Sequence, residues 1–176
     1  MGTVPETTGE ASGAGPVTVG YRSWPGPARE MALAVDAAVS AARAGDAAAF
    51  TDALDDLGRM DREQLAVVLG AVTRELLERS HPDGVGSDDA EQVLTSCLRS
   101  AASWYEALDG DALIQALTGT LGIHDPDESA PPASPAVVAH GLLLIADQLT
   151  TMGEALPPVL DRALRELMRA QTIEFP

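Results

Sequence analysis

The chain of 176 residues contains no lysine, and all eleven of its basic residues are arginine. A P-loop places a lysine on the nucleotide phosphates, and Schiff-base chemistry requires a lysine amine. Both kinds of site, and a lysine general base, are therefore excluded. The glycine-rich segments do not follow a predicted strand, so a dinucleotide-binding loop has no support either.

Cysteine occurs once, as Cys97, so no disulfide can form within the chain. No positively charged, apolar leader precedes the predicted domain, and we expect a cytoplasmic location. Cys97 lies on the apolar stripe of a predicted helix, where a thiol behaves as a small, inert hydrophobe. No cysteine and histidine spacing suits zinc, and the acidic loops at 81–89 and 124–128 lack calcium-loop spacing. We therefore expect neither a metal nor a cofactor.

Basic residues are few: the chain has 27 acidic residues and only 11 basic ones, so its formal net charge is −16. Such a charge repels phosphate backbones and anionic lipids, so we expect neither nucleic acid nor a membrane as a partner. The longest apolar runs, at 65–72 and 141–146, are far shorter than the roughly 20 residues of a membrane span, and they predict buried helices. The acidic surface either serves solubility or meets a basic surface on another protein.

Aromatic residues are also scarce, with two each of Trp, Tyr and Phe, although 45% of the chain is hydrophobic. A core of Ala, Leu and Val suits closely packed helices and leaves few residues for strands. The fold class predicted is all-α, a compact bundle of about seven helices. Residues 1–26, rich in Gly, Thr and Pro, are expected to form a flexible tail, and 27–176 a single helical domain.

Apolar residues at helical spacing, together with capping residues, place the individual helices. In the last helix, Asp161 with Arg165 and Arg162 with Glu166 are predicted to pair four residues apart on the solvent side. The predicted helices cover 27–44, 47–57, 61–80, 88–108, 111–121 and 135–152, with the last beginning at 157 or 158.

A faint internal echo offers an alternative description of the bundle. The triplet "GDA" occurs at 45–47 and at 110–112, and "LG" at 57–58 and at 121–122. Each time a long helix is followed by a Gly-Asp break, a short helix and an apolar helix. The chain would then consist of two three-helix halves closed by a C-terminal helix.

Three of the six aromatic residues lie outside the predicted core. Tyr21 and Trp24 stand at the end of the N-terminal tail, and Phe175 stands in the other tail. They either fold back to cover the domain or dock a partner, so all three are candidate binding residues.

His140 interrupts an otherwise apolar predicted helix, in "AVVAHGLLLIA". A buried polar group needs a partner, so we expect a hydrogen bond to a backbone carbonyl or to an acid. The alternative is a small-molecule pocket beside this ring, which makes His140 a candidate binding residue as well.

The tripeptide His81-Pro82-Asp83 resembles the signature of J-domain co-chaperones, which stands between two antiparallel helices. The resemblance implies stimulation of a heat-shock chaperone ATPase and covers at most some 60 residues. The preceding "TRELLERS" balances its charges, whereas the helix of that family is strongly basic.

The same segment also has a purely structural interpretation. Pro82 ends one helix, and Asp88 with Glu91 three residues later predicts the N-cap of the next. Every conspicuous residue except His81 then has a structural role, and we expect an exposed imidazole.

These observations favour an acidic, soluble, cytoplasmic protein-interaction or regulatory module without catalysis of its own. Its expected partner is another protein with a basic or apolar docking surface, and a homo-oligomer is left open. The alternatives are a helical small-molecule-binding protein or enzyme with a pocket near His140, and a degenerate J-domain-like co-chaperone.

Overall fold

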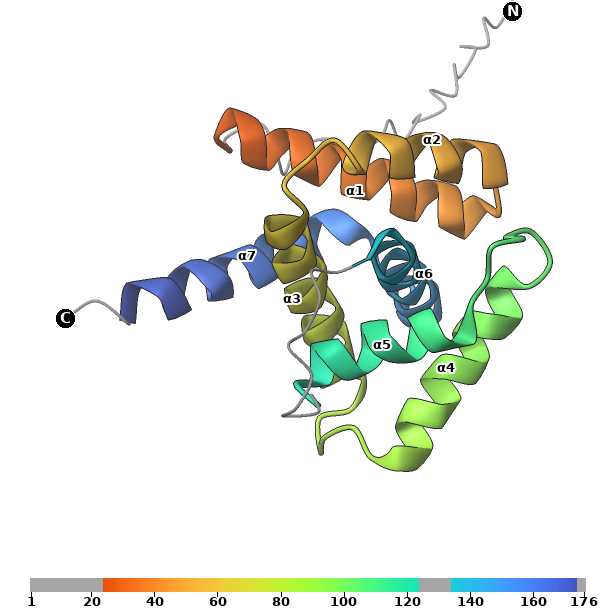
Figure 1. The fold of residues 1–176 in the computed structure, drawn as a ribbon. Helices are drawn as coiled ribbons and strands as arrows, with labels where there is room; N and C mark the ends of the chain where they lie inside the picture. Colours follow the sequence, from red (N-terminus) through yellow and green to blue (C-terminus); the bar gives the residue numbers. More distant parts are fainter. Residues whose placement is uncertain (1–23, 124–133, 174–176) are drawn as a thin grey trace, which may run out of the picture.

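The computed structural model describes residues 24–123 and 134–173. Its seven helices form a compact bundle, and the described residues contain no strand, so the predicted all-α class is confirmed (Figure 1). In chain order the helices are α1 (Gly26–Ala44), α2 (Ala47–Leu57), α3 (Arg62–Ser80), α4 (Ser87–Ala101), α5 (Gly110–Leu121), α6 (Pro135–Met152) and α7 (Leu156–Ile173).

Helix α6 is the centre of the bundle, and α1, α3, α4 and α5 all pack against it. Every residue from Val138 to Leu149 is buried. By length and composition alone, α6 is the one helix among the described residues that could cross a membrane, yet 67% of it is buried inside the bundle. A central helix touched on several sides is expected to be apolar all round, which explains its composition.

Helices α2 and α7 pack mainly on the helices that surround α6. Helices α1 and α2 lie side by side as a hairpin, and α7 packs on α3 before running outward from the bundle (Figure 1). The apolar residues at helical spacing in α1 form its buried face: Met31, Val35, Ala38, Val39 and Ala42.

Helix starts follow the capping residues in the sequence. The carboxylate of Asp46 accepts a hydrogen bond from the backbone of Ala49 at 3.0 Å, and that of Asp61 accepts one from Gln64 at 2.9 Å. These bonds satisfy amides that have no partner within the helix. Helix α2 therefore begins where it was predicted to begin, and α3 begins one residue later than predicted.

Helix α4 differs from the prediction at both ends. It begins at Ser87 with Gly86 as N-cap, so the prediction of Asp88 as the cap was wrong. Instead, the Asp89 carboxylate accepts a hydrogen bond from the Gly86 amide at 2.9 Å. It ends at Ala101 and does not continue to Leu108.

An aromatic cluster explains the early end of α4. Trp104 and Tyr105 turn back onto Phe50 of α2, with ring centroids 5.4 and 5.3 Å away in edge-on geometry. Such aromatic pairs contribute about 0.5–1.5 kcal/mol each beyond their buried area. The tertiary contact therefore overrides the apolar spacing that predicts a helix as far as residue 108.

The two halves suggested by the internal echo share a helix order but not a packing arrangement. In the first half α2 lies along α1, whereas in the second half α5 packs mainly on α6 and only weakly on α4.

Gly45 should be a position where a side chain is costly. It ends α1 with φ of +67°, a left-handed conformation that residues with a side chain rarely adopt, while an added Cβ would be in ordinary contact with the Trp104 ring at 3.5 Å. We expect Gly45→Ala to lower the free energy of unfolding by about 1–2 kcal/mol, measured by urea denaturation. Gly110→Ala is the control, because φ of Gly110 is not positive and a Cβ there meets nothing within 4 Å. Equal losses in both variants would contradict the explanation.

Candidate functional site

A groove of about 990 Å³ lies between α3, the end of α5 and the outer part of α7. We call it the α3–α7 groove. Its walls are helices whose backbone groups are bonded internally, so side chains determine what it can bind. Gly119 and Thr120 of α5 line it at one side.

Helix α3 supplies most of the groove because it has two apolar faces. Its core face consists of apolar residues at helical spacing, all of them buried: Leu65, Val68, Leu69, Val72 and Leu76. Its second face consists of small residues at helical spacing, which line the groove: Ala66, Val67, Gly70 and Ala71.

Val67 shows that this second face is not covered, because 49% of it is exposed. The run at 65–72 predicted only a buried helix, and this second, exposed face of the helix was given no role. The signal was present, because eight consecutive apolar residues make more than two turns and cannot all point to one side.

The outer part of α7 forms the opposite wall, through Ala163, Leu167 and Ala170. Leu167 is half-buried, and its neighbour Met168 is 68% exposed. The end of α5 is held in place by Arg74, whose guanidinium donates to the carbonyl of Thr120 at 2.9 Å. The walls of the groove are therefore held in place by contacts between the helices of the bundle.

Charge along the groove is predominantly negative, since four glutamates line it and only one arginine, Arg74, does. Glu75 pairs with Arg162 at 2.7 Å, and Glu166 pairs with an arginine of its own helix at 2.5 Å. Within the part of the chain that the structure describes, Glu63 and Glu78 make no ion pair.

The partner of Arg162 differs from the predicted one. Arg162 binds Glu75 of α3, so its predicted solvent-side pair with Glu166 was wrong. The companion prediction is confirmed, because Arg165 pairs with Asp161 at 2.5 Å. Arg162 thus joins α7 to α3 beside the groove.

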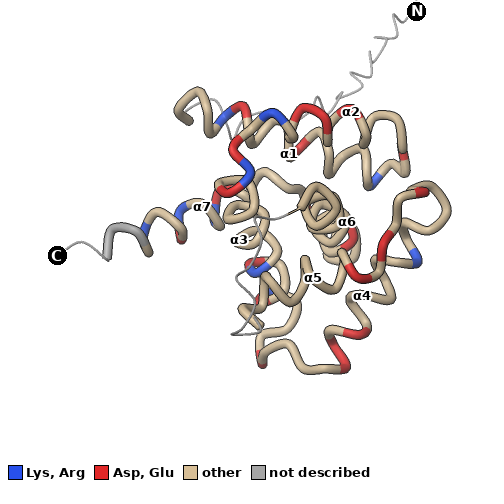
Figure 2. The backbone as a smooth tube through the Cα atoms, viewed as in Figure 1, with Lys and Arg blue, Asp and Glu red and all other residues tan. Residues whose placement is uncertain are grey.

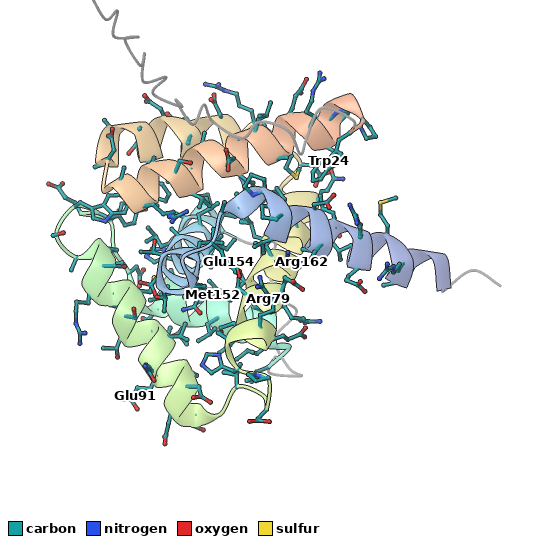
Figure 3. The ribbon with its side chains drawn as sticks, turned by 180° about the vertical axis from the view of Figure 1, so that it is seen from behind. Trp24, Arg79, Glu91, Met152, Glu154 and Arg162 are labelled. Atoms are coloured by element: carbon teal, nitrogen blue, oxygen red, sulfur yellow. The ribbon has the colours of Figure 1, made fainter. Side chains whose placement is uncertain are left out.

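A second set of contacts at Glu154, in the turn between α6 and α7, fixes the start of α7. Both terminal nitrogens of Arg79 donate to the Glu154 carboxylate, and Arg162 lies 3.7 Å from the same carboxylate (Figure 3). Arg43 donates to the backbone carbonyl of Glu154 at 3.0 Å. The hydrogen bond from Arg79 lowers the pKa of Glu154, and the charges of Arg79 and Arg162 act in the same direction.

Stability should therefore depend on the ionisation of Glu154. Because its folded-state pKa lies below the usual 4.5, its contribution is present above that value and is lost as pH falls through the lowered pKa. In urea titrations, we expect Glu154→Gln to be less stable than the unmodified chain at neutral pH. The difference should shrink on acidification. A difference that is constant with pH would contradict this assignment.

His140 is fully buried and bonded at both ring nitrogens. Nε2 accepts from the backbone amide of Asp109 at 2.8 Å, so the ring hydrogen is on Nδ1, which donates to the carbonyl of Ala136 at 2.7 Å. The expected bond to a carbonyl is confirmed. Tyr105 lies edge-on at 5.9 Å. The ring connects α6 to the start of α5 and has no free nitrogen for a ligand.

Replacing this ring should weaken the junction between α5 and α6. His140→Leu leaves the Asp109 amide without an acceptor, and we expect a loss of about 2 kcal/mol in the free energy of unfolding. His81→Leu is the control, with an expected loss below about 1 kcal/mol, because its ring is partly exposed. Denaturant unfolding followed by circular dichroism measures both, and a larger loss in the control would refute this ranking.

His81 is not the exposed imidazole that was predicted. Only 21% of its side chain is exposed; Nδ1 lies 2.9 Å from the Ser80 hydroxyl and 3.3 Å from the Leu77 carbonyl, and Nε2 lies 3.9 Å from Asp89. The ring folds over the last turn of α3 because His81 is the C-cap of that helix. Its partners are thus groups at the ends of α3 and α4.

Cys97 is fully buried, as predicted. Burial raises the pKa of its thiol to about 12, and the nearby Asp147 carboxylate acts in the same direction. Asp147, on the apolar α6, is also buried, which was not predicted. One of its oxygens accepts from the Ser96 hydroxyl at 3.1 Å, and the other has no hydrogen-bond partner among the described residues.

The remaining candidates lie at the edge of the described residues or outside them. Trp24 is half-buried against the core at the start of α1 (Figure 3). Tyr21, Phe175 and the acidic loop at 124–128 lie outside the described residues. Within the described residues, no group of three or more His, Cys, Asp or Glu side chains could hold a metal ion.

Comparisons with protein families, with curated proteins and with solved structures found no match.

Proposed function

We propose that this chain is an acidic protein-interaction module that binds a basic partner protein in the α3–α7 groove. The observation that carries the proposal is the second face of α3. An apolar helical face that the bundle leaves uncovered, as at Val67, is typical of a surface that another chain covers.

The state of the other candidate groups supports a binding role over catalysis. Both nitrogens of His140 are bonded within the protein, and the Cys97 thiol is buried with a raised pKa. Nucleophilic catalysis needs an accessible nucleophile beside a base, which neither group provides.

Charge supports a basic partner. The net charge is −16, and the acids extend over α2, α4 and the connections between helices, whereas blue and red alternate along α7 (Figure 2). Acids near an apolar groove attract partners whose docking surface carries arginine or lysine, and they repel acidic competitors.

Gly70→Leu should block the groove without damaging the fold. A Cβ at Gly70 meets nothing within 4 Å, and leucine favours a helix over glycine by about 0.8 kcal/mol. With a photo-crosslinking amino acid in place of Val67, we expect one partner to be crosslinked in cells of the source organism. Gly70→Leu should reduce that product at least about tenfold.

Two controls accompany this experiment. Gly110→Leu adds the same side chain at an exposed position away from the groove, and it should leave the product unchanged. The same crosslinker in place of Leu33, which is 44% exposed on α1, should not yield the product. Equal crosslinking at both sites, or an unchanged product in Gly70→Leu, would refute the proposed function.

A further inference from the structure

We infer that the occupant of the α3–α7 groove is an amphipathic α-helix of a different protein, lying along α3 with a basic residue near each end. This inference rests on the proposed function and names the chemistry of its partner.

The walls of the groove favour a helix over an extended segment. Helices α3 and α7 bond their backbone groups internally, and the groove offers no strand edge. An extended peptide would lose water from its own amides and carbonyls without gaining backbone partners, whereas a helix brings them already bonded. Helix-in-groove binding is the mode that such a surface suits.

Two glutamates of α3 indicate how long the bound helix is and where its basic residues lie. The groove-lining residues of α3 run from Glu63 to Glu78, at opposite ends of one helical face. Fifteen residues of α-helix span about 22 Å, so a partner helix of about four turns covers this distance. Neither carboxylate has an ion-pair partner among the described residues, so each is available to an arginine or lysine.

The middle of α3 favours close approach of the partner. Gly70 and Ala66 are one turn apart and present almost no side chain, while Val67 and Ala71 supply apolar contact. Helix axes pack about 8–10 Å apart, nearer when the side chains between them are small. The partner helix is therefore expected to place its apolar stripe over these positions.

A second copy of this chain is a poor occupant. Each copy carries a net charge of −16, which opposes self-association. Among the seven helices only α7 has more arginines than acids, namely Arg162, Arg165 and Arg169 against Asp161 and Glu166. That helix already forms a wall of the groove, so the basic helix must come from another protein.

Three synthetic peptides of about 18 residues test this inference with the full chain. The first is an amphipathic helix with a Leu/Ala stripe and arginines near both ends. The second has the same composition in scrambled order, and the third is the first with glutamate in place of arginine. Fluorescence anisotropy measures affinity, circular dichroism measures helix formation, and amide chemical shifts locate the binding site.

We expect the first peptide to bind as a helix, at least about tenfold more tightly than the other two, and to shift amides of α3 and α7. Glu63→Gln with Glu78→Gln should weaken it at least about fivefold. The matched pair Asp88→Asn with Glu91→Gln also removes two negative charges, one from a first helical turn, and should leave the affinity unchanged. Gly70→Leu should abolish binding.

Other results overturn the inference. Equal binding of the scrambled peptide, equal weakening by both charge pairs, or shifts confined to other helices would each show charge attraction without a helix in the groove. Absence of binding at about 1 mM peptide would also overturn the inference. The proposed function is decided separately, by the crosslinked product at Val67 and its loss in Gly70→Leu.

Discussion

The fold depends on the burial of α6. Twelve consecutive residues of this helix are enclosed, which requires neighbours on several sides, and α1, α3, α4 and α5 provide them. The burial of apolar surface supplies the driving force, at about 25 cal/mol per Å². The same burial requires each polar side chain on α6 to find a hydrogen-bond partner inside the protein. His140 is satisfied by the Asp109 amide and the Ala136 carbonyl, so the same ring that enters the core also fixes the start of α5.

The α3–α7 groove follows from how this central helix is covered. Helix α3 gives one face to α6 and part of another to α7, which is anchored at its start by the contacts of Glu154 and Arg162. Beyond that anchor α7 runs outward (Figure 1). The second face of α3 is left without a complete cover. The proposed binding site is thus a consequence of packing in which one helix has two apolar faces and only one is fully used.

Sequence reasoning succeeded where short-range interactions decide the structure. Asp46 and Asp61 cap their helices through bonds three residues away, and Gly45 ends α1 with the backbone conformation that glycine favours. It failed where distant residues compete with these local preferences. Trp104 and Tyr105 fit the stripe of α4, but their contact with Phe50 places them beyond its end. The groove was missed for a related reason, because the apolar run at 65–72 does not reveal which of its faces is covered.

The sequence by itself determined the all-α class, most helix bounds, the acidic charge and the absence of lysine chemistry. These properties follow from composition and from interactions within one or two helical turns. Only the tertiary structure decided that Arg162 meets Glu75, 87 residues away, that His140 meets Asp109, 31 residues away, and that α3 keeps an open face. Contacts of this kind depend on which helices pack side by side. That arrangement is set by the total apolar surface that all the helices bury around α6, and it cannot be predicted from any one segment of the sequence.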